Sequence, residues 1–308
     1  MTAGRVDAFA AEVGPSGAGP VVAVGGHTQW DVGVVDAAAL AAARPVAAPA
    51  GVLALEAADM TVRVGAGTLV SDVDAALAEV GQAVALPDWP GATVGGVLAV
   101  GHSGRRRLGW GPVRDTLLEV RYASAEGAVV KAGGPTVKNV SGFDLCRLLV
   151  GSLGTLGLMA EVVLRTRPLP PASRWLAGEA DPFALLHALH RPSTLLWDGT
   201  TTWALLEGHP ADVESQARAS GLDPAAAGPD LPPHRWSLRP SALAALPGDG
   251  HGPFVAEVGV GVVHRQVAPP ARSVERPVAA LHARIKALFD PTGRLAPGRD
   301  PLAGAEAA

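Results

Sequence analysis

Short apolar runs separated by glycine, proline and polar residues divide the first 170 residues into predicted strands. The run at 21–24 leads straight into Gly25-Gly26-His27-Thr28, which is typical of a buried strand followed by a tight loop. Residues 113–123 and 129–132 flank Glu126-Gly127 and predict a hairpin. The other predicted strands are 53–56, 61–64 and 158–164.

Helical periodicity is clearest in residues 71–80, where Val73, Ala76, Leu77 and Val80 share one helical face. Ser71 to Asp74 has the form of a capping box at the start of this helix, and Gly81 suits its end. We therefore interpret Gly65-Ala66-Gly67 as a strand-to-helix turn rather than a ligand loop. A shorter helix is expected before Gly14.

The pattern weakens after Pro168 and Pro170, where we place a domain boundary. Residues 182–190 predict a helix, and 254–263 alternate like a strand. Residues 191–250 are rich in proline and alanine and predict few elements. Val278, Leu281, Ile285 and Leu288 define an amphipathic helix started by Pro277, followed by a turn at 290–293. The expected domains are 1–170 and 171–308.

The glycine-rich stretch 87–111 is the first candidate for binding chemistry. Backbone N–H groups that are not screened by side chains can surround phosphate oxygens, and Thr93 and Ser103 add hydroxyl donors. The glycine spacing fits neither the Rossmann fingerprint nor the P-loop. A glycine-rich surface loop without a ligand is the alternative interpretation.

Composition excludes several classes of protein. The chain has 308 residues and a formal net charge of −4, which argues against a general nucleic-acid binder. Cys146 is the single cysteine, so no disulfide framework and no cysteine-ligated iron–sulfur cluster can form within this sequence. We expect no membrane span, because no run of about 18 strongly apolar residues occurs. The N-terminus lacks a signal-peptide pattern, which favours the cytoplasm.

Four segments, in this order, carry a family resemblance: VVAVGGHTQW, PDWPGATVGGVLAVGHSGRRRLGWGPVRDTLLEV, KNVSGFDLCRLLVGSLGTLGLMAEVVLRTRPLP and FDPTGRLAPGR. Together they resemble the vanillyl-alcohol oxidase, or PCMH-type, family of FAD-binding domains. The third segment is similar to the FAD-binding (E-type) subunit of glycolate oxidase. The resemblance covers residues 20–170 well and 254–299 loosely. It implies an α+β fold, with a PCMH-type FAD-binding domain of two α/β subdomains followed by a short α+β cap domain.

The resemblance also implies which residues would surround FAD. The set comprises Gly25, Gly26, His27, Thr28, Pro87, Gly91, Thr93, Val94, Gly95, Gly96, His102, Ser103, Gly104, Gly151, Gly154, Thr155, Leu156, Gly157, Glu161 and Val162. No metal is expected. Catalytic residues are not identified, because the short region after Pro170 shows no recognisable acid–base constellation.

By the same resemblance, the chain would be the FAD-binding subunit of a glycolate oxidase-like complex. The complex would oxidise a small 2-hydroxy acid to a 2-oxo acid, with a second flavoprotein subunit and an iron–sulfur subunit as partners. The alternatives are a self-sufficient FAD-dependent alcohol or hydroxy-acid oxidase and a non-catalytic assembly subunit.

Several single residues have two interpretations. His27 stands where some relatives attach flavin covalently, but a hydrogen-bonding loop histidine with non-covalent flavin is our prediction. His102 could donate to the flavin or be a satisfied loop residue. Arg105–Arg107 are either a solvated charge run or a contact for a carboxylate or a partner. His187 and His190 are expected on a surface helix, and Cys146 is expected to be a buried structural thiol.

Overall fold

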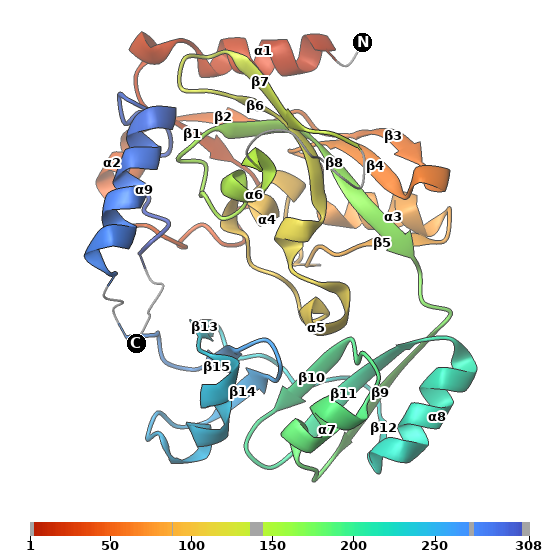
Figure 1. Ribbon diagram of the computed structural model, residues 1–308. Helices are drawn as coiled ribbons and strands as arrows, with labels where there is room; N and C mark the ends of the chain where they lie inside the picture. Colours follow the sequence, from red (N-terminus) through yellow and green to blue (C-terminus); the bar gives the residue numbers. More distant parts are fainter. Residues whose placement is uncertain (1–2, 88, 136–143, 271–273, 304–308) are drawn as a thin grey trace. The chain divides into compact units, whose positions relative to one another are not determined.

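The computed structural model describes residues 3–87, 89–135, 144–270 and 274–303, which form two compact units, each treated on its own (Figure 1). The first unit comprises residues up to 104, together with 112–169 and 274–303. The second comprises 105–111 and 170–273. Residues 274–303 therefore pack with the N-terminal unit instead of the expected domain 171–308, and their buried polar contacts, described below, give the reason.

The first unit is built on a sheet with strand order β3-β4-β8-β6-β7, and β5 pairs with β8 beside it. All pairings in this sheet are antiparallel. Its strands are β3 (Val52–Glu56), β4 (Thr61–Gly65), β5 (Gln82–Val84), β6 (Leu117–Ala123), β7 (Val129–Gly133) and β8 (Leu158–Pro168). The strands and the hairpin expected in this region are thus confirmed, except that the expected strand 113–123 begins at Leu117, because Val113–Asp115 form a 3-10 turn.

Helices α3 (Val70–Ala78), α4 (Val94–Val100) and α6 (Leu145–Leu149) supply buried side chains to the main core of this unit. The predicted helix after Gly67 is confirmed as α3, but its capping box is wrong. Leu69 is the N-cap residue and no side chain caps the helix, while Val80 lies beyond its end and is exposed. Sequence analysis did not predict α4, because the glycines in its first turn lower helix propensity. Thr93 caps α4 by accepting a hydrogen bond from Gly96 N at 3.2 Å.

Helix α1 (Ala3–Val13) confirms the short helix expected before Gly14. Its side chains at 6, 9, 10 and 13 form a buried stripe with the i, i+3, i+4, i+7 spacing of an amphipathic helix. This stripe joins a second core with Ala123, Leu158 and Ala160. Figure 1 shows α1 lying along β6 and β7.

A separate parallel pair, β1 (Val21–Val24) and β2 (Arg44–Ala47), stands beside α2 (Ala37–Ala42). Leu295 pairs in parallel with Val21, so the C-terminal segment extends this small sheet. Helix α9 (Arg276–Phe289) precedes this segment and confirms the predicted C-terminal helix. Its residues Ile285 and Phe289 pack against the main core, whereas Val278, Leu281 and Leu288 are exposed.

The second unit is a seven-stranded antiparallel sheet in the order β12-β9-β11-β10-β14-β15-β13. Its elements are α5 (Arg107–Trp110), β9 (Ala172–Gly178), α7 (Pro182–Ala188), β10 (Thr194–Trp197), β11 (Thr202–Gly208), α8 (Pro210–Ser220), β12 (Asp223–Ala225), β13 (His234–Ser237), β14 (Phe254–Glu257) and β15 (Val262–Arg265). Short 3-10 turns occur in the first unit at Ser16–Ala18, Ala57–Asp59 and Val113–Asp115, and a nine-residue 3-10 helix, Pro240–Gly248, occurs in the second.

The structure corrects two expectations that sequence analysis raised for this unit. Residues 254–263 do not form one strand, because Gly259 and Gly261 take positive φ angles and turn the chain between β14 and β15. Residues 191–250, for which few elements were predicted, supply four complete strands of the sheet, β10 to β13, and helix α8. Across the described residues, no helix is long and apolar enough to cross a membrane.

Candidate cofactor site

The first unit contains a cavity into which the glycine-rich segments converge. Its lining includes part of each of the four segments that sequence analysis quoted, the fourth of which contributes Arg299. The expected cofactor residues that line it are Gly25, Gly26, His27, Thr28, Thr93, Gly95, Gly96, Gly154 and Gly157. Apolar walls come from residues such as Val22, Val97, Leu153 and Met159.

The loop after β1 offers hydrogen-bond donors to this cavity. Among the described residues, the backbone N–H groups of Gly25, Gly26, His27 and Thr28 have no acceptor within hydrogen-bonding distance. His27 has a positive φ of 56° and its ring lies 4.4 Å from that of Trp30, measured between centroids. Unpaired amides converging on a concave surface are suited to phosphate oxygens.

The same loop is closely packed on its other side. A methyl group at Gly26 would overlap the carbonyl oxygen of Gly91, and one at Gly25 would overlap the Thr93 hydroxyl. These glycines are therefore required by the approach of one loop to another. Gly91 itself does not line the cavity, but its carbonyl group packs closely against the loop at Gly26.

The amides at the start of α4 are already used inside the protein. Gly95 N donates to Ala66 O at 2.7 Å, and Gly96 N donates to Thr93 Oγ1 at 3.2 Å. A Cβ atom on Gly95 would lie 2.9 Å from Ala66, so this glycine permits the helix to pack against the turn after β4. The idea that these two amides contact phosphate is not supported.

Other expected cofactor residues lie outside the lining. Val94, Leu156 and Val162 are buried in the main core, and Glu161 pairs with Arg63 at 2.8 Å. Although burial acts to lower it, the hydrogen bonds to Glu161 and Glu119 raise the pKa of Arg63 overall. These four residues stabilise the sheet that carries the site, and we do not carry them into the proposed site.

The remaining expected residues support the loops. Gly104 packs against Pro87, and Gly151 approaches Gly101 at the end of α4. Ser103 Oγ accepts a hydrogen bond from Val113 N at 3.0 Å, and Thr155 Oγ1 donates to Ser152 O at 2.7 Å.

His102 reaches the cavity indirectly. Its Nδ1 lies 3.4 Å from Gln29 Nε2, and Gln29 is a lining residue. Gln29 Oε1 is buried and has no hydrogen-bond partner among the described residues. An unpaired buried acceptor is costly, so a donor group of a bound ligand is expected there.

Sequence analysis missed four contributors of note: Ala66 and Gly67 of the turn after β4, Trp89 and Arg299. The turn was interpreted as purely structural, and it is both a strand-to-helix turn and part of the wall. Arg299 lies in the quoted segment FDPTGRLAPGR, which was the available signal. Its side chain donates to Val32 O at 2.6 Å and Trp30 O at 2.7 Å.

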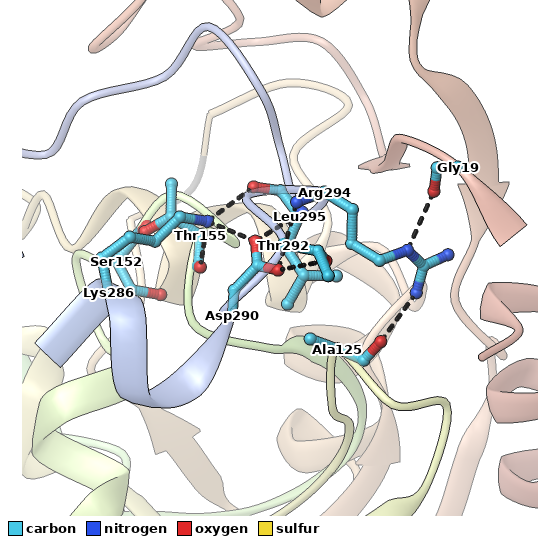
Figure 2. Close-up of polar contacts among 9 residues, drawn as sticks. All are labelled: Gly19, Ala125, Ser152, Thr155, Lys286, Asp290, Thr292, Arg294 and Leu295. Carbon is cyan, nitrogen blue, oxygen red and sulfur yellow. Dashed lines mark hydrogen bonds and ion pairs between the residues drawn. The ribbon is translucent and has the colours of Figure 1, made fainter. Parts of the chain in front are cut away.

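The C-terminal segment reaches the cavity through a buried polar cluster (Figure 2). Asp290 is fully buried and accepts hydrogen bonds from Lys286 Nζ at 2.5 Å and from the backbone N–H groups of Arg294 and Leu295. Lys286 Nζ also donates to the carbonyls of Thr155 and Leu295. The segment is therefore tied to the loop before β8.

Arg294 ties the same segment to the N-terminus. Its guanidinium is buried and donates to the carbonyl oxygens of Val13, Gly14, Gly19 and Ala125, at 2.7 to 3.0 Å. Burial lowers the pKa of Arg294, and Asp290 acts in the opposite direction. This arrangement joins both ends of the chain around the cavity-bearing unit.

A second group of polar residues lies within the second unit. In the backbone register, Arg235 on β13 lies opposite His264 on β15, and Glu257 on β14 lies opposite Val262 on β15. Since positions 262 and 264 share a face of β15, the side chains of Arg235, Glu257 and His264 lie on one face of the sheet. The core residues Trp236, Ala256 and Val263 lie on the other.

This polar face holds an acid–base pair beside two cations. His264 Nε2 lies 2.9 Å from Glu257 Oε1, and both side chains are nearly buried. Burial lowers the pKa of Arg235, Glu257 opposes this, and the nearby Arg107 adds to it. The described residues include no hydrogen-bonding or ion-pair partner for the Arg235 guanidinium. The cluster thus carries a cation suited to an external carboxylate.

The arginine run 105–107 is not simply solvated. Arg106 Nε pairs with Glu207 Oε1 at 3.0 Å, and Arg105 O accepts a hydrogen bond from Thr194 Oγ1 at 3.0 Å. The run therefore lies on the sheet face that bears Thr194 and Glu207.

The other singled-out residues are as follows. His187 and His190 are exposed, and no group of three or more potential metal ligands occurs among the described residues. Burial raises the pKa of the Cys146 thiol to about 11, as suits a structural cysteine. Residues 138–143 of the quoted third segment lie outside the described residues.

Comparison with known proteins places these observations in a family context. Residues 17–133 match the family model of the FAD binding domain. Over 134 residues the chain is 37% identical to glycolate oxidase subunit GlcE of Escherichia coli (strain K12), covering 42% of this chain and 38% of that protein. It is 36% identical over 122 residues to a mitochondrial D-lactate dehydrogenase (cytochrome) of Arabidopsis thaliana, covering 40% of this chain and 22% of that protein.

A further relative is glycolate oxidase subunit GlcD of Bacillus subtilis (strain 168), 36% identical over 85 residues, covering 28% of this chain and 18% of that protein. The matched parts of these relatives are thus well under half of their length. Among solved structures, alkyldihydroxyacetonephosphate synthase superposes with a TM-score of 0.66 at 13% identity, covering 95% of this chain and 73% of that chain. That likeness concerns the fold alone, and it confirms the mixed helix and sheet architecture expected from the sequence.

Proposed function

We propose that this chain is the FAD-binding subunit of a glycolate oxidase-like complex, because residues 17–133 match the family model of the FAD binding domain and the chain is similar to a glycolate oxidase subunit. The complex would oxidise a small 2-hydroxy acid to a 2-oxo acid and pass the electrons to a partner subunit. The cavity in the first unit is the observation that carries the proposal, because its loop amides and Gln29 Oε1 lack protein partners among the described residues.

The residues present fit FAD. The amides of Gly25 to Thr28 would hold phosphate oxygens, and the apolar walls around Val97, Leu153 and Met159 suit an aromatic ring system. Gln29 Oε1 would accept a hydrogen bond from the cofactor. FAD, when bound, supplies a two-electron acceptor for substrate oxidation.

The polar face of the second unit supports the 2-hydroxy-acid part of the proposal. Arg235 and Arg107 would bind the substrate carboxylate, because guanidinium groups match carboxylates in shape and charge. On the same face, His264 and Glu257 form an acid–base pair through the 2.9 Å contact. Sequence analysis could not assign any of these roles.

The single cysteine of this sequence supports the proposal that electrons pass to a partner. Its single cysteine is buried and its thiol pKa is raised, so it cannot ligate a cluster. A second flavoprotein subunit and an iron–sulfur subunit would supply the onward path, in line with the likeness to the GlcE and GlcD subunits.

The polar face also favours one rival, a self-sufficient hydroxy-acid oxidase, because a complete acid–base and carboxylate set would make partner residues unnecessary for the chemistry. The test is anaerobic mixing of the purified FAD-loaded chain with glycolate and with D-lactate, followed by flavin absorbance. Rapid bleaching and fast steady-state turnover with an artificial acceptor by the chain alone would favour the rival. Bleaching only after co-expression with partner subunits would favour the complex.

Two outcomes would contradict the proposal. A purified chain that retains no FAD after reconstitution would refute the cofactor part and leave an assembly subunit. An FAD-loaded chain that no 2-hydroxy acid bleaches, with or without partner subunits, would refute the substrate part. The variant Arg235→Gln, with Arg218→Gln on the exposed face of α8 as its control, tests the carboxylate role through the KM for the acid.

A further inference from the structure

Arg299 stands out because of its charge. Among the described residues that line the cavity, it is the one side chain with a full positive charge, and none of these residues is an aspartate, a glutamate or a lysine. Burial lowers its pKa and Asp31 partly opposes this, but an arginine stays charged under such conditions. FAD carries two negative charges on its diphosphate, and four neutral amides alone would leave them uncompensated.

The guanidinium is also rigidly placed. Two of its five N–H groups donate to Val32 O and Trp30 O, and its Cζ atom lies over the Trp30 ring, 4.6 Å from the ring centroid. These carbonyls belong to the loop that begins at Gly25. Arg299 therefore fixes the end of the loop whose residues line the cavity, and three of its N–H groups are not used by these two hydrogen bonds.

The backbone that carries Arg299 is anchored on both sides. Gly298 O accepts hydrogen bonds from the N–H groups of Val35 and Asp36, and Asp300 N donates to Gly33 O. Upstream, the Lys286, Asp290 and Arg294 contacts hold the segment against the same unit (Figure 2). A long, flexible side chain with this much support loses little further freedom when it binds an anion.

We propose that Arg299 binds the diphosphate of FAD and thereby makes the C-terminal segment part of the cofactor site. This proposal rests on FAD binding by the first unit and not on the oxidation of a hydroxy acid. Its consequence is selectivity: ligands that contain the diphosphate gain from Arg299, and ligands that lack it do not.

The experiment measures binding of FAD and of riboflavin to the apo-form of the full chain by flavin fluorescence, in the wild type, Arg299→Gln and Arg299→Lys. Arg44→Gln is the matched control, since Arg44 also donates to a backbone carbonyl of this unit but does not line the cavity. ADP and adenosine, used as competitors of FAD, give a second pair that differs in the diphosphate. Circular dichroism checks the fold of each variant.

Arg299→Gln is expected to lower the affinity for FAD and for ADP by about tenfold or more, which is the range for losing a hydrogen bond to a charged group. The affinities for riboflavin and adenosine should change by less than about twofold. Arg299→Lys should recover part of the FAD affinity at low salt, because it keeps the charge. Equal losses for FAD and riboflavin would show that Arg299 only orders the loop, and no loss would show that it does not contact the cofactor. Either result would overturn the proposal. Should Arg299→Gln not fold, the lysine variant and the salt dependence of wild-type FAD binding decide between the same outcomes.

Discussion

Asp290 is the residue whose replacement tests most directly how the C-terminal segment is held. We predict that Asp290→Asn strongly destabilises the first unit, although the two side chains have nearly the same shape. The carboxylate is fully buried and accepts hydrogen bonds from Lys286 Nζ, Thr292 Oγ1 and two backbone N–H groups. All four partners are donors (Figure 2).

The magnitude follows from this donor set. Oδ2 receives Lys286 Nζ and Leu295 N, while Oδ1 receives Arg294 N and Thr292 Oγ1. Either orientation of an asparagine amide places its NH2 group against donors and leaves the partly buried Lys286 without its counter-charge. Breaking a buried ion pair by removing one partner costs about 3–5 kcal/mol, which is a large part of the stability of an ordinary domain.

Urea denaturation followed by circular dichroism measures the change in the free energy of unfolding. The matched control is Asp36→Asn, in which an exposed carboxylate caps α2 by accepting from Ala38 N and Ala39 N at 3.0 Å. Asparagine caps helices as well as aspartate does, so this control should change stability by less than about 0.5 kcal/mol. If Asp290→Asn costs no more than the control, the segment is not held by this cluster and the reasoning is wrong.

Three further predictions concern the site and the thiol. Gly26→Ala should abolish FAD retention, because the added methyl group would overlap Gly91 O. Gly17→Ala is the control and should retain the cofactor, because the space around Gly17 is open. Equal FAD content in the two variants would contradict the packing argument. The flavin should be released by acid precipitation, and yellow colour that stays in the pellet and disappears in His27→Ala would show covalent attachment instead. Because its pKa is raised to about 11, only about one thousandth of Cys146 should be thiolate at pH 8. A thiol reagent should therefore modify it only after denaturation. Rapid labelling of the native chain at pH 8 would show instead that the thiol is accessible and ionised.

The strands of the first unit could be predicted because each is a short apolar run with clear turn residues at its ends. Helix α4 could not, since Gly95 and Gly96 in its first turn lower helix propensity. The structure shows that Gly95 is required there, as a Cβ atom would lie 2.9 Å from Ala66. The same packing requirement that produced the glycine signal therefore concealed the helix.

The candidate cofactor site was found in outline because glycine-rich loops are visible in sequence. The finer assignment was less reliable, since a resemblance transfers whole segments and not individual side-chain directions. Gly154 and Gly157 line the cavity, while Leu156 between them points into the core. Arg299 was overlooked because its role depends on the fold bringing residue 299 to the carbonyls of Trp30 and Val32, some 270 residues earlier in the chain.

The polar face of the second unit shows why an acid–base constellation can be absent from a sequence and present in a structure. His264 and Glu257 are seven residues apart, and Arg235 lies far upstream, so no spacing rule joins them. Antiparallel register joins them instead, because β15 pairs with β13 on one side and β14 on the other. The turn that contains Gly259 and Gly261 sets the register of β14 and β15, and a shift by one residue would send His264 to the core face and Val263 to the polar face. The chemistry of this face is therefore encoded in the turn glycines as much as in the charged residues themselves.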